Sequence, residues 1–479
     1  MTTSMIPLVP PIVLLGPPGA GKSTAGALLA QQLGFCFIDL DELAGVHHLV
    51  DEGLASFRVR EHLALIEAID RGAVVVAAGA GVVDTGPARE LLARCLCLGL
   101  DVDVDTALPR LRAAGVERRP WLGALEHQRP NWLAREEHRP RHRAQLSAGD
   151  VDGRLDPPLV AAALRALVER SRCGLSVLDD VDDRLTLGSG FVIADSAVAE
   201  RLERCDLVVD VAAGKGLAQV ERMLQALVRS GRNNNVVVGV GGGTLLDLVG
   251  LAAALCHRGT PWRAVPTTLL AMVDAALGGK TAVDVVVDGA LVRNAAGAFH
   301  PPATTCVWPG FLSTLSPAAL RHGKAELLKH QLLSGGIQRV DVDDDAIRSS
   351  RGVKRWFVER DPRERHLRKA LNLGHTFAHA FESRFAIAHG DAVLHGLERM
   401  LKLSVDVAGL DAAFAAQTHR SIAALGAPPL PALDDDDRAA LLTSMRQDKK
   451  GPGQLVLLRA PGQPVLAAVD DDVLLSALI

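Results

Sequence analysis

The sequence predicts an α/β protein, and three observations carry this expectation. An apolar run at 11–15 leads into a phosphate-binding glycine loop and then into a helical pattern that Gly34 closes. Two further apolar runs end in polar or glycine residues, which is typical of neighbouring strands in an open parallel sheet. A buried-strand pattern at 235–240 leads into a second glycine turn that opens a helix. We therefore expect two α/β units, each with a ligand site at the end of its strands.

Length and composition favour an enzyme that acts on small molecules. A chain of 479 residues predicts two or three domains, and its 48% hydrophobic and 23% charged content excludes a largely disordered protein. There is no tyrosine and only 3% aromatic residues, so stacking of nucleic-acid bases is not expected. The 52 basic and 56 acidic residues nearly cancel, which gives no overall field for nucleic acid or membrane lipid.

The seven cysteines are scattered, odd in number and lack CxxC spacing, so we expect reduced thiols and no disulfide framework. The N-terminal stretch lacks a basic region and runs directly into the glycine loop, which argues against a signal peptide. No apolar stretch reaches membrane-spanning length without Gly, Pro or charge. These features predict a cytoplasmic protein.

The first glycine loop, which begins at Gly16, matches the pattern GxxxxGK[ST]. Glycines let backbone N–H groups surround phosphate oxygens at a helix start, and the lysine reaches the transferred phosphoryl group. The serine hydroxyl is a ligand for magnesium. The expected residues of this ATP and magnesium site are Gly19, Gly21, Lys22, Ser23 and Thr24.

The next two predicted strands place more polar residues at the same sheet edge. The run 35–40 ends in Asp39-Leu-Asp41, and the following strand ends in Gly79-Ala-Gly81. Ligands collect at the carboxyl ends of parallel strands, so these residues join the candidate site. An alternative for the two aspartates is a solvated loop or a helix N-cap.

These motifs resemble shikimate kinase over about residues 10–172. The likeness rests on GPPGAGKST, the aspartate pair, the FRVRE run, the GAG turn and RRPWL at 118–122. It implies a P-loop kinase, a parallel sheet flanked by helices, in which Lys22, Asp41 and Arg119 take part in the reaction. The residues that it assigns to magnesium and ATP are Asp39, Arg112 and the lid residue Arg119, and those that it assigns to shikimate are Asp41, Arg58, Gly79 and Gly81.

This half departs from the family in three places. Ala80 stands in the middle of the usual triple-glycine turn, where its methyl group threatens a close approach of substrate. The segment after Asp41 is shorter than the family's substrate-binding region. Near residue 140, histidines occupy the positions of a usual arginine and tyrosine, so Arg135 or Arg139 would have to substitute by a small shift.

The second glycine turn is followed by further turn residues and cations. A glycine turn can admit pyrophosphate onto a helix N-terminus, although glycines alone are a weak signal. Threonines, glycines and interspersed cations strengthen it, because they suit a dinucleotide beside a phosphorylated substrate. These residues are Gly241, Gly242, Gly243, Asp247, Arg258, Thr267, Thr268, Asp274, Lys280 and Asn294.

A set of residues typical of metal sites follows in the helical patterns. Its members are Glu326, Lys329, Asn372, His375, His379 and His389. His375 and His379 share one helix face and could form a metal pair by themselves. Such a pair more often belongs to surface or core, but the additional carboxylate and imidazole favour a metal site with an open position for substrate.

Together these motifs resemble 3-dehydroquinate synthase, one of the sugar-phosphate cyclases, over nearly the whole second half. The likeness rests on VPTTLLAMVD, LGGKTAV, KAELLKH, LNLGHTFAHAFE and the late DKK at 448–450. It implies a Rossmann-like NAD-binding part followed by an all-helical metal-binding part. It assigns zinc, with cobalt as a possible substitute, to Glu326, His375 and His389, and it moves His379 from the metal to the substrate phosphate.

The same resemblance implies the remaining site residues and the domain limits. The expected NAD-binding residues are Asp195, Lys215, Gly241, Gly242, Gly243, Asp247, Thr267 and Thr268. The expected substrate residues are Arg258, Asp274, Lys280, Asn294, Lys329, Lys354, Arg368, Asn372, His379 and Lys449 or Lys450, of which Lys280, Lys329, Lys354 and His379 are catalytic. The expected limits are 1–172 for the kinase half, 173–183 for a linker, 184–310 for the NAD-binding part and 311–479 for the helical zinc and substrate part.

This half also departs from its family. Ala212 stands where a NAD-facing glutamate is usual, and Arg293 replaces a lysine at the end of a lengthened loop. The segment between Lys329 and Lys354 is much shorter. The zinc and substrate residues are nearly complete, whereas the adenosine end of the NAD site is the part that differs.

The sequence therefore predicts a bifunctional enzyme that phosphorylates shikimate with MgATP. With NAD and zinc, it also converts 3-deoxy-arabino-heptulosonate 7-phosphate to 3-dehydroquinate and phosphate. Arg368 favours a substrate that carries a carboxylate. Two alternatives stay open: a kinase half reduced to a nucleotide-binding module, or a cyclase with another substrate. The resemblance also implies a homodimer through the C-terminal half, in which Arg258 reaches a phosphate across the interface.

Overall fold

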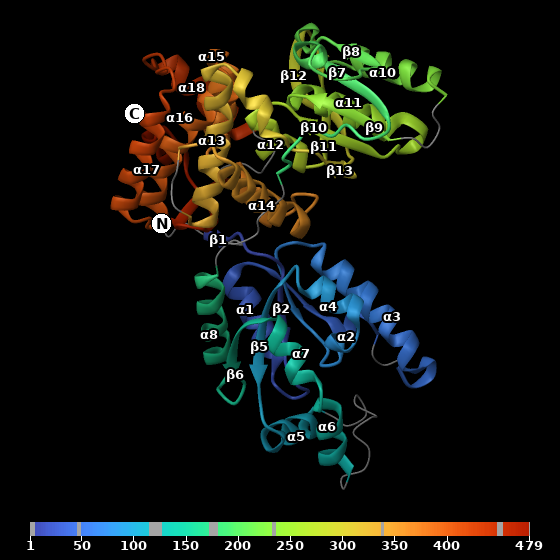
Figure 1. Cartoon of the computed structure of the whole chain (residues 1–479). Coiled ribbons are helices and arrows are strands. Elements are labelled where there is room, and N and C mark those ends of the chain that lie inside the picture. The colour runs from blue at the N-terminus through green and yellow to red at the C-terminus, as the bar shows by residue number, and fades with distance from the viewer. Residues whose placement is uncertain are drawn as a thin grey trace. The chain divides into compact units, whose positions relative to one another are not determined.

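The computed structural model describes residues 5–45, 49–114, 127–171, 181–231, 236–336, 340–447 and 454–478. Contacts between Cα atoms divide the chain into two units, which are described separately (Figure 1). Unit 1 is formed mainly by Cys173–Val358 and Ala370–Ile479, and unit 2 by Met5–Arg172 and Glu359–Lys369. None of the described helices combines the length and apolar character that a membrane span requires.

Unit 2 alternates strands and helices. Its elements are β1 (Met5–Pro7), β2 (Ile12–Leu15), α1 (Lys22–Leu33), β3 (Cys36–Asp39), α2 (Leu40–Leu43), α3 (Leu49–Ile69), β4 (Val74–Ala77), the 3-10 helix η2 (Val82–Asp84), α4 (Gly86–Leu92), β5 (Leu96–Asp101), α5 (Val104–Ala113), α6 (Gln128–Glu136), α7 (Arg139–Leu146), β6 (Ser147–Asp152) and α8 (Pro157–Arg170). Five of the strands form a parallel sheet in the order β3-β4-β2-β5-β6.

Strand β2 lies at the centre of this sheet and is buried on both faces. Ile12 and Leu14 pack in one core cluster with residues of α1, α5 and α8, whereas Val13 and Leu15 pack in a second cluster with residues of α2, α3 and α4. Continuous apolar strands of this kind are expected where helices cover both faces of a sheet. Figure 1 shows α1 and α8 on one side of β2 and β5, and α3 and α4 on the other. Helix α1 ends at Gly34, which has φ of 70°, as the sequence predicts.

Unit 1 begins with a second α/β arrangement. Its elements are β7 (Phe191–Asp195), α9 (Ser196–Ala199), β8 (Leu207–Val209), the 3-10 helix η6 (Val211–Ala213), α10 (Leu217–Arg229), β9 (Val237–Gly241), α11 (Gly243–Leu255), η7 (Cys256–Arg258), β10 (Trp262–Pro266), α12 (Leu269–Val273), η8 (Ala275–Leu277), β11 (Lys280–Val287), β12 (Ala290–Phe299), β13 (Thr304–Thr305) and η9 (Pro309–Thr314). A parallel sheet runs in the order β13-β10-β9-β7-β8, and β11 pairs with β12 in an antiparallel hairpin.

The remainder of unit 1 is mainly helical. Its elements are α13 (Pro317–Ser334), α14 (Asp344–Arg360), η10 (Leu367–Asn372), α15 (His375–Phe385), α16 (His389–Leu403), the π-helix η11 (Ser404–Ala408), α17 (Ala412–Leu425), α18 (Asp435–Gln447), β14 (Gln454–Ala460), β15 (Gln463–Ala468) and α19 (Asp471–Ser476). The α/β arrangement followed by helices is the predicted fold. The antiparallel pair of β14 and β15 adds strands that the sequence reasoning did not expect in this part.

Helices α15 and α16 approach each other closely because glycines face each other at their crossing. Gly374, with φ of 75°, precedes α15, and an ideal Cβ built on Gly396 in α16 would lie 2.1 Å from its carbonyl oxygen. Only a residue without a side chain permits this approach. The same two helices begin with His375 and His389, so the glycine contact fixes the spacing of two candidate metal ligands.

We expect Gly396→Ala to lower the free energy of unfolding by about 1–3 kcal/mol, because the added methyl group overpacks the crossing of α15 and α16. Chemical denaturation of the full-length chain measures the change. Gly216→Ala is the matched control, since an ideal Cβ at Gly216 meets no atom within 4 Å. Equal stability of the two variants would contradict the close contact.

Candidate active sites

The phosphate-binding loop of unit 2 joins β2 to α1. Gly19 and Gly21 have φ of 86° and 85°, a backbone conformation that favours glycine. An ideal Cβ on Gly19 would also lie 2.8 Å from the carbonyl oxygen of Ala107. Lys22, the first residue of α1, donates from Nζ to the carbonyls of Gly16 at 2.9 Å and Pro17 at 3.0 Å. The lysine therefore lies over its own loop, where a bound phosphate would compete for it.

Ser23 and Asp39 come together at the edge of this loop. The Ser23 hydroxyl donates to Asp39 Oδ2, and Asp39 Oδ1 accepts from the amide of Asp41 at 3.1 Å. Hydroxyl and carboxylate oxygens are ligands that magnesium prefers. The N-cap interpretation of Asp39 also holds, because its side chain caps α2. Thr24 lies exposed in the first turn of α1.

Two contacts that the sequence reasoning missed hold the loop from outside. Trp132 in α6 donates from Nε1 to the carbonyl of Pro18 at 3.2 Å. Arg110 in α5 donates to the carbonyls of Gly153 at 2.7 Å and Gly19 at 3.4 Å. Arg110 lies two positions from Arg112, one of the predicted ATP residues, whose Nε donates to Gln128 at 2.8 Å. Arg119 lies outside the described residues.

The predicted shikimate residues converge at the ends of β3 and β4. An ideal Cβ on Gly79 would lie 2.4 Å from Oδ1 of Asp41, and one on Gly81 would lie 2.0 Å from Nη2 of Arg58. Both glycines therefore lie directly against polar groups of the candidate site. Glu61 is buried beside them and ion-paired to Arg58 at 2.5 Å. Burial raises the pKa of Glu61, although Arg58 opposes the shift.

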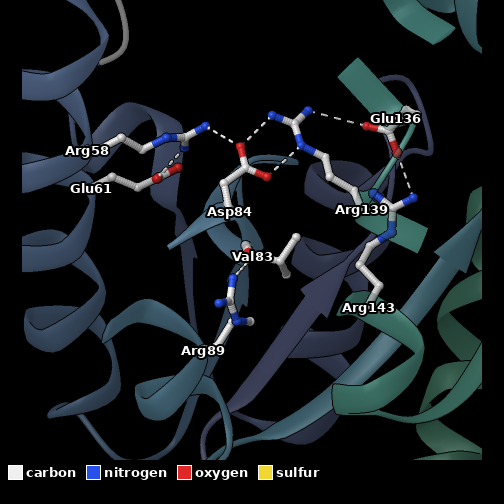
Figure 2. A network of polar contacts seen from close by, with 8 residues as sticks. All are labelled: Arg58, Glu61, Val83, Asp84, Arg89, Glu136, Arg139 and Arg143. Carbon is white, nitrogen blue, oxygen red and sulfur yellow. Dashed lines mark hydrogen bonds and ion pairs between the residues drawn. The ribbon is translucent and has the colours of Figure 1, made fainter. Parts of the chain in front are cut away.

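Arg139 is one of the two arginines that the sequence offers near residue 140. It begins α7, is buried, and contacts Asp84 through Nε at 2.9 Å and Nη2 at 2.7 Å (Figure 2). Asp84 also accepts from Arg58 at 2.8 Å. The structure thus brings Arg139 to the predicted shikimate residue Arg58, with one carboxylate between them.

In unit 1, the second glycine turn forms the start of α11. Gly242 is its N-cap and offers no side-chain cap, which leaves the first helical N–H groups available to an anion. The amide of Thr267 donates to the carbonyl of Gly241 at 3.0 Å, and Thr268 Oγ1 caps α12. Asp195 is buried at the end of β7, and an ideal Cβ on Gly241 would lie 3.2 Å from its Cβ. Five of the predicted NAD residues therefore share one sheet edge.

Lys215 connects this edge to the β11–β12 hairpin. Its ammonium pairs with Asp247 at 2.5 Å and contacts the side chain of Asn294, which has φ of 50°. Asp284 accepts from the Asn294 amide at 2.7 Å. Burial raises the pKa of Asp247, against the opposing effect of Lys215. Ala212, at the position of the usual glutamate, is exposed.

The predicted metal ligands meet in the helical part. Glu326 in α13, His375 in α15 and His389 in α16 each offer a ligand atom within 4.8 Å of the others. Both oxygens of Glu326 are buried, and Oε1 lies 3.4 Å from Nε2 of His375 and 3.8 Å from Nε2 of His389. Two imidazoles and one carboxylate around a buried point suit zinc or a similar divalent ion with an open fourth position. Asp274, Glu326 and His330 form a second group, and their potential ligand atoms also lie within 4.8 Å of one another.

The Nδ1 atoms of His375 and His389 each contact a hydrogen-bond acceptor. His375 Nδ1 lies 3.1 Å from the carbonyl of Leu373, and His389 Nδ1 lies 2.7 Å from Glu382. Such contacts fix the tautomer that leaves Nε2 for a metal. The other oxygen of Glu382 accepts from Arg293 at 2.7 Å. The sequence reasoning missed Glu382, although its position seven residues after His375 on one helix face was an available signal.

The two histidines differ in proton affinity. Burial and Lys329 lower the pKa of His375 to about 3, so this ring is neutral. Burial also opposes the charge of His389, but the carboxylates of Glu326 and Glu382 outweigh it and raise its pKa to about 10. A metal at this centre would have to displace the proton of His389, which makes binding weaker as the pH falls.

Cations and acids surround the open side of this centre. Lys329 is buried and ion-paired with Glu326, and Lys354 pairs with Asp274 at 2.5 Å. Burial opposes the charge of Asp274, but Lys354 and Lys329 hold its pKa below its usual range. The His379 ring lies edge-on to that of His375, with the ring centroids 5.7 Å apart, and His379 belongs to neither candidate metal group among the described residues.

The other predicted substrate residues are placed as follows. Arg258, with φ of 65°, and Lys280 at the start of β11 are exposed, and Asn372 ends η10. Arg368 belongs to the segment 359–369, which groups with unit 2, and there its Nη1 donates to the carbonyl of Pro362 at 2.7 Å. Lys449 and Lys450 lie outside the described residues.

Three family models match the chain. The shikimate kinase model covers residues 18–157, and the N-terminal and C-terminal models of 3-dehydroquinate synthase cover 206–322 and 321–451. A bifunctional shikimate kinase/3-dehydroquinate synthase of Thermotoga maritima is 31% identical over 81% of this chain and 83% of its own length. The chain belongs to the bifunctional shikimate kinase/3-dehydroquinate synthase family. The two resemblances that the sequence predicts are thereby confirmed.

The synthase half has further relatives. A 3-dehydroquinate synthase of Nitrobacter winogradskyi is 35% identical over 53% of this chain and 73% of its own length. Among solved structures, 2-epi-5-epi-valiolone synthase of Streptomyces hygroscopicus, with NAD and zinc bound, is 27% identical with a TM-score of 0.52. It covers 60% of this chain and 89% of its own.

We expect Glu382→Gln to weaken zinc binding by about 10-fold to 100-fold, because the amide no longer fixes the ring of His389 as a carboxylate does. Competition with a chromogenic chelator measures the affinity without any turnover. Glu398→Gln is the matched control, since Glu398 contacts a histidine, His395, that is not among the metal ligands. Unchanged zinc affinity in Glu382→Gln would contradict the orienting role.

Proposed function

We propose that this chain is a bifunctional enzyme of aromatic precursor synthesis. Its first half transfers phosphate from MgATP to shikimate. Its second half, with NAD and zinc, converts 3-deoxy-arabino-heptulosonate 7-phosphate to 3-dehydroquinate and phosphate. The observation that carries the proposal is the presence of two separate, nearly complete sites in one chain, one around Lys22 and one around Glu326.

In the kinase half, we assign phosphate binding to the loop amides and to Lys22. Ser23 and Asp39 lie where they would hold magnesium, and Asp41 lies beside Gly79 at the acceptor end. Phosphoryl transfer needs positioned cations around the moving charge and a carboxylate near the attacking hydroxyl. With these groups in place, a kinase half reduced to a nucleotide-binding module is the less favoured alternative.

In the synthase half, we assign the metal to Glu326, His375 and His389 and NAD to the edge formed by β7, β9 and α11. When bound, zinc polarises a substrate hydroxyl and NAD accepts and returns a hydride. The buried lysines Lys329 and Lys354 supply positive charge for the leaving phosphate, and His379, whose ring contacts that of His375, is assigned to this phosphate on the resemblance. Arg368 is assigned to the substrate carboxylate on the resemblance alone.

We further propose a homodimer formed by the synthase half, with 173–183 as the linker between 1–172 and 184–479. Within the synthase half, 184–310 would be the NAD-binding part and 311–479 the zinc and substrate part. The exposed apolar side chains of the β11–β12 hairpin, such as Val286 and Leu291, support the dimer, since exposed apolar patches often mark interfaces. Light scattering on the separate 184–479 segment and on the full chain would test it.

Two single substitutions should separate the activities. We expect Lys22→Met to reduce shikimate phosphorylation by at least about 100-fold, because it removes the cation at the transferred phosphate, and to leave phosphate release from the heptulosonate phosphate unchanged. His389→Ala should do the reverse, because it removes a ligand of the metal centre. Parallel assays of each variant with both substrate sets measure the effects.

The wild-type chain must show both activities in these assays. Lack of shikimate phosphorylation in the wild type would reject the kinase assignment, and lack of phosphate release with NAD and zinc would reject the synthase assignment. Glu67→Gln serves as a control for both assays, because Glu67 of α3 pairs only with exposed Arg71, two residues after that helix, among the interactions described.

A further inference from the structure

The acceptor end of the kinase half contains a chain of ion pairs (Figure 2). Asp84 is its central member and accepts from Arg58 at 2.8 Å and from Arg139 at 2.7 and 2.9 Å. Glu61 holds Arg58 from the other side, and Glu136 holds Arg139 at 3.4 Å and also pairs with Arg143 at 2.6 Å. The guanidiniums of this chain therefore already have carboxylate partners before any substrate binds.

Asp84 differs from the two glutamates in its accessibility. The side chains of Glu61 and Glu136 are 5% and 6% exposed, whereas that of Asp84 is 34% exposed. Asp84 also ends η2, directly after the Gly81 turn that lies against Arg58. A carboxylate at this position can leave the two guanidiniums for solvent without unfolding a buried core.

The geometry between Asp84 and its partners matches that of a bound carboxylic acid. Its two oxygens accept hydrogen bonds from Nε and Nη2 of Arg139, one each. The oxygen that accepts from Nη2 of Arg139 also accepts from Nη2 of Arg58. Two-point binding by arginine is the usual way in which proteins hold a ligand carboxylate. If shikimate binds here, its carboxylate needs the same guanidinium edges.

We propose that Asp84 is an internal competitor for the substrate carboxylate, which occupies the site formed by Arg58 and Arg139 until shikimate displaces it. This inference rests on the proposed kinase function. Displacement exchanges one ion pair for another, so the gain on binding is smaller than for unpaired guanidiniums. After displacement, Glu61 and Glu136 still hold Arg58 and Arg139 in place. Asp84 would thus set the affinity for substrates that carry a carboxylate, and would leave uncharged analogues unaffected.

A different role makes the opposite prediction. If Asp84 only positioned Arg58 and Arg139 for the substrate, its removal would weaken shikimate binding, because the guanidiniums would lose their orientation. The direction in which the affinity for shikimate changes therefore distinguishes a competing role of Asp84 from a positioning role.

The test compares full-length wild type with Asp84→Asn, which keeps the size of the side chain and removes its charge. We expect the KM for shikimate and its Kd by calorimetry to fall about tenfold, since the charge-assisted contacts of Asp84 with Arg58 and Arg139 no longer have to be broken. The kcat should change less than about twofold. Asp84→Ala should shift both constants in the same direction, and Glu67→Gln, which removes a carboxylate of α3 from an exposed ion pair, should shift neither.

Shikimate methyl ester is the second probe, because it lacks the charge that competes with Asp84. We expect its KM to be the same in wild type and Asp84→Asn. An unchanged or raised Kd for shikimate in Asp84→Asn, or an equal fall for acid and ester, would overturn the proposal. If no form of the protein phosphorylates shikimate, the proposed kinase function fails, and the calorimetric Kd still decides on Asp84.

Discussion

Both sites depend on one constraint, which is that a charge removed from water must be compensated by its neighbours. Glu326 is the clearest case, since its side chain is 1% exposed. Lys329 pairs with it, and two imidazoles face it. Without these groups an ionised carboxylate at this depth would strongly destabilise the fold. The cluster that a metal requires is thus also the arrangement that makes the buried glutamate tolerable.

Positioning of that cluster depends on how closely the helices pack. His375 and His389 begin α15 and α16, so their separation follows from the crossing of these two helices. Gly374 and Gly396 permit the crossing because neither carries a side chain at the contact. Arg293 then reaches Glu382 from the β12 strand and connects the sheet part of the synthase half to the ligand His389. Local sequence, helix packing and ligand geometry are linked in this region.

The local motifs were predictable from the sequence because each carries its own chemistry within a few residues. The glycine loop before Lys22 and the turn before α11 required only the order of strand, glycines and helix. The grouping of Glu326 with His375 and His389 could not be derived from spacing, which favoured the pair His375 and His379. It came from the resemblance, and in the structure one potential ligand atom of each of these three residues lies within 4.8 Å of the others.

Contacts between distant segments were the part that sequence reasoning could not supply. Asp84 and Arg139 are 55 residues apart, and nothing in either local pattern identifies the other as its partner. The choice between Arg135 and Arg139 stayed open for the same reason. Glu382 is different, since a spacing of seven residues from His375 places both on one face of α15, and this pattern is local to the sequence.

Ion pairs that form before substrate arrives explain why the near balance of 52 basic and 56 acidic residues is compatible with two anionic substrates. In the kinase half, Asp84 is ion-paired with two guanidiniums. In the synthase half, Asp274 is ion-paired with Lys354, and Glu326 with Lys329. An anion gains by entering such a site only if it reproduces the geometry of the pair that it replaces. Exchange of this kind trades affinity for discrimination, because a poorly fitting anion cannot compensate the groups that it separates. In both halves, the internal carboxylates would therefore favour anions that fit the cationic groups over anions that do not.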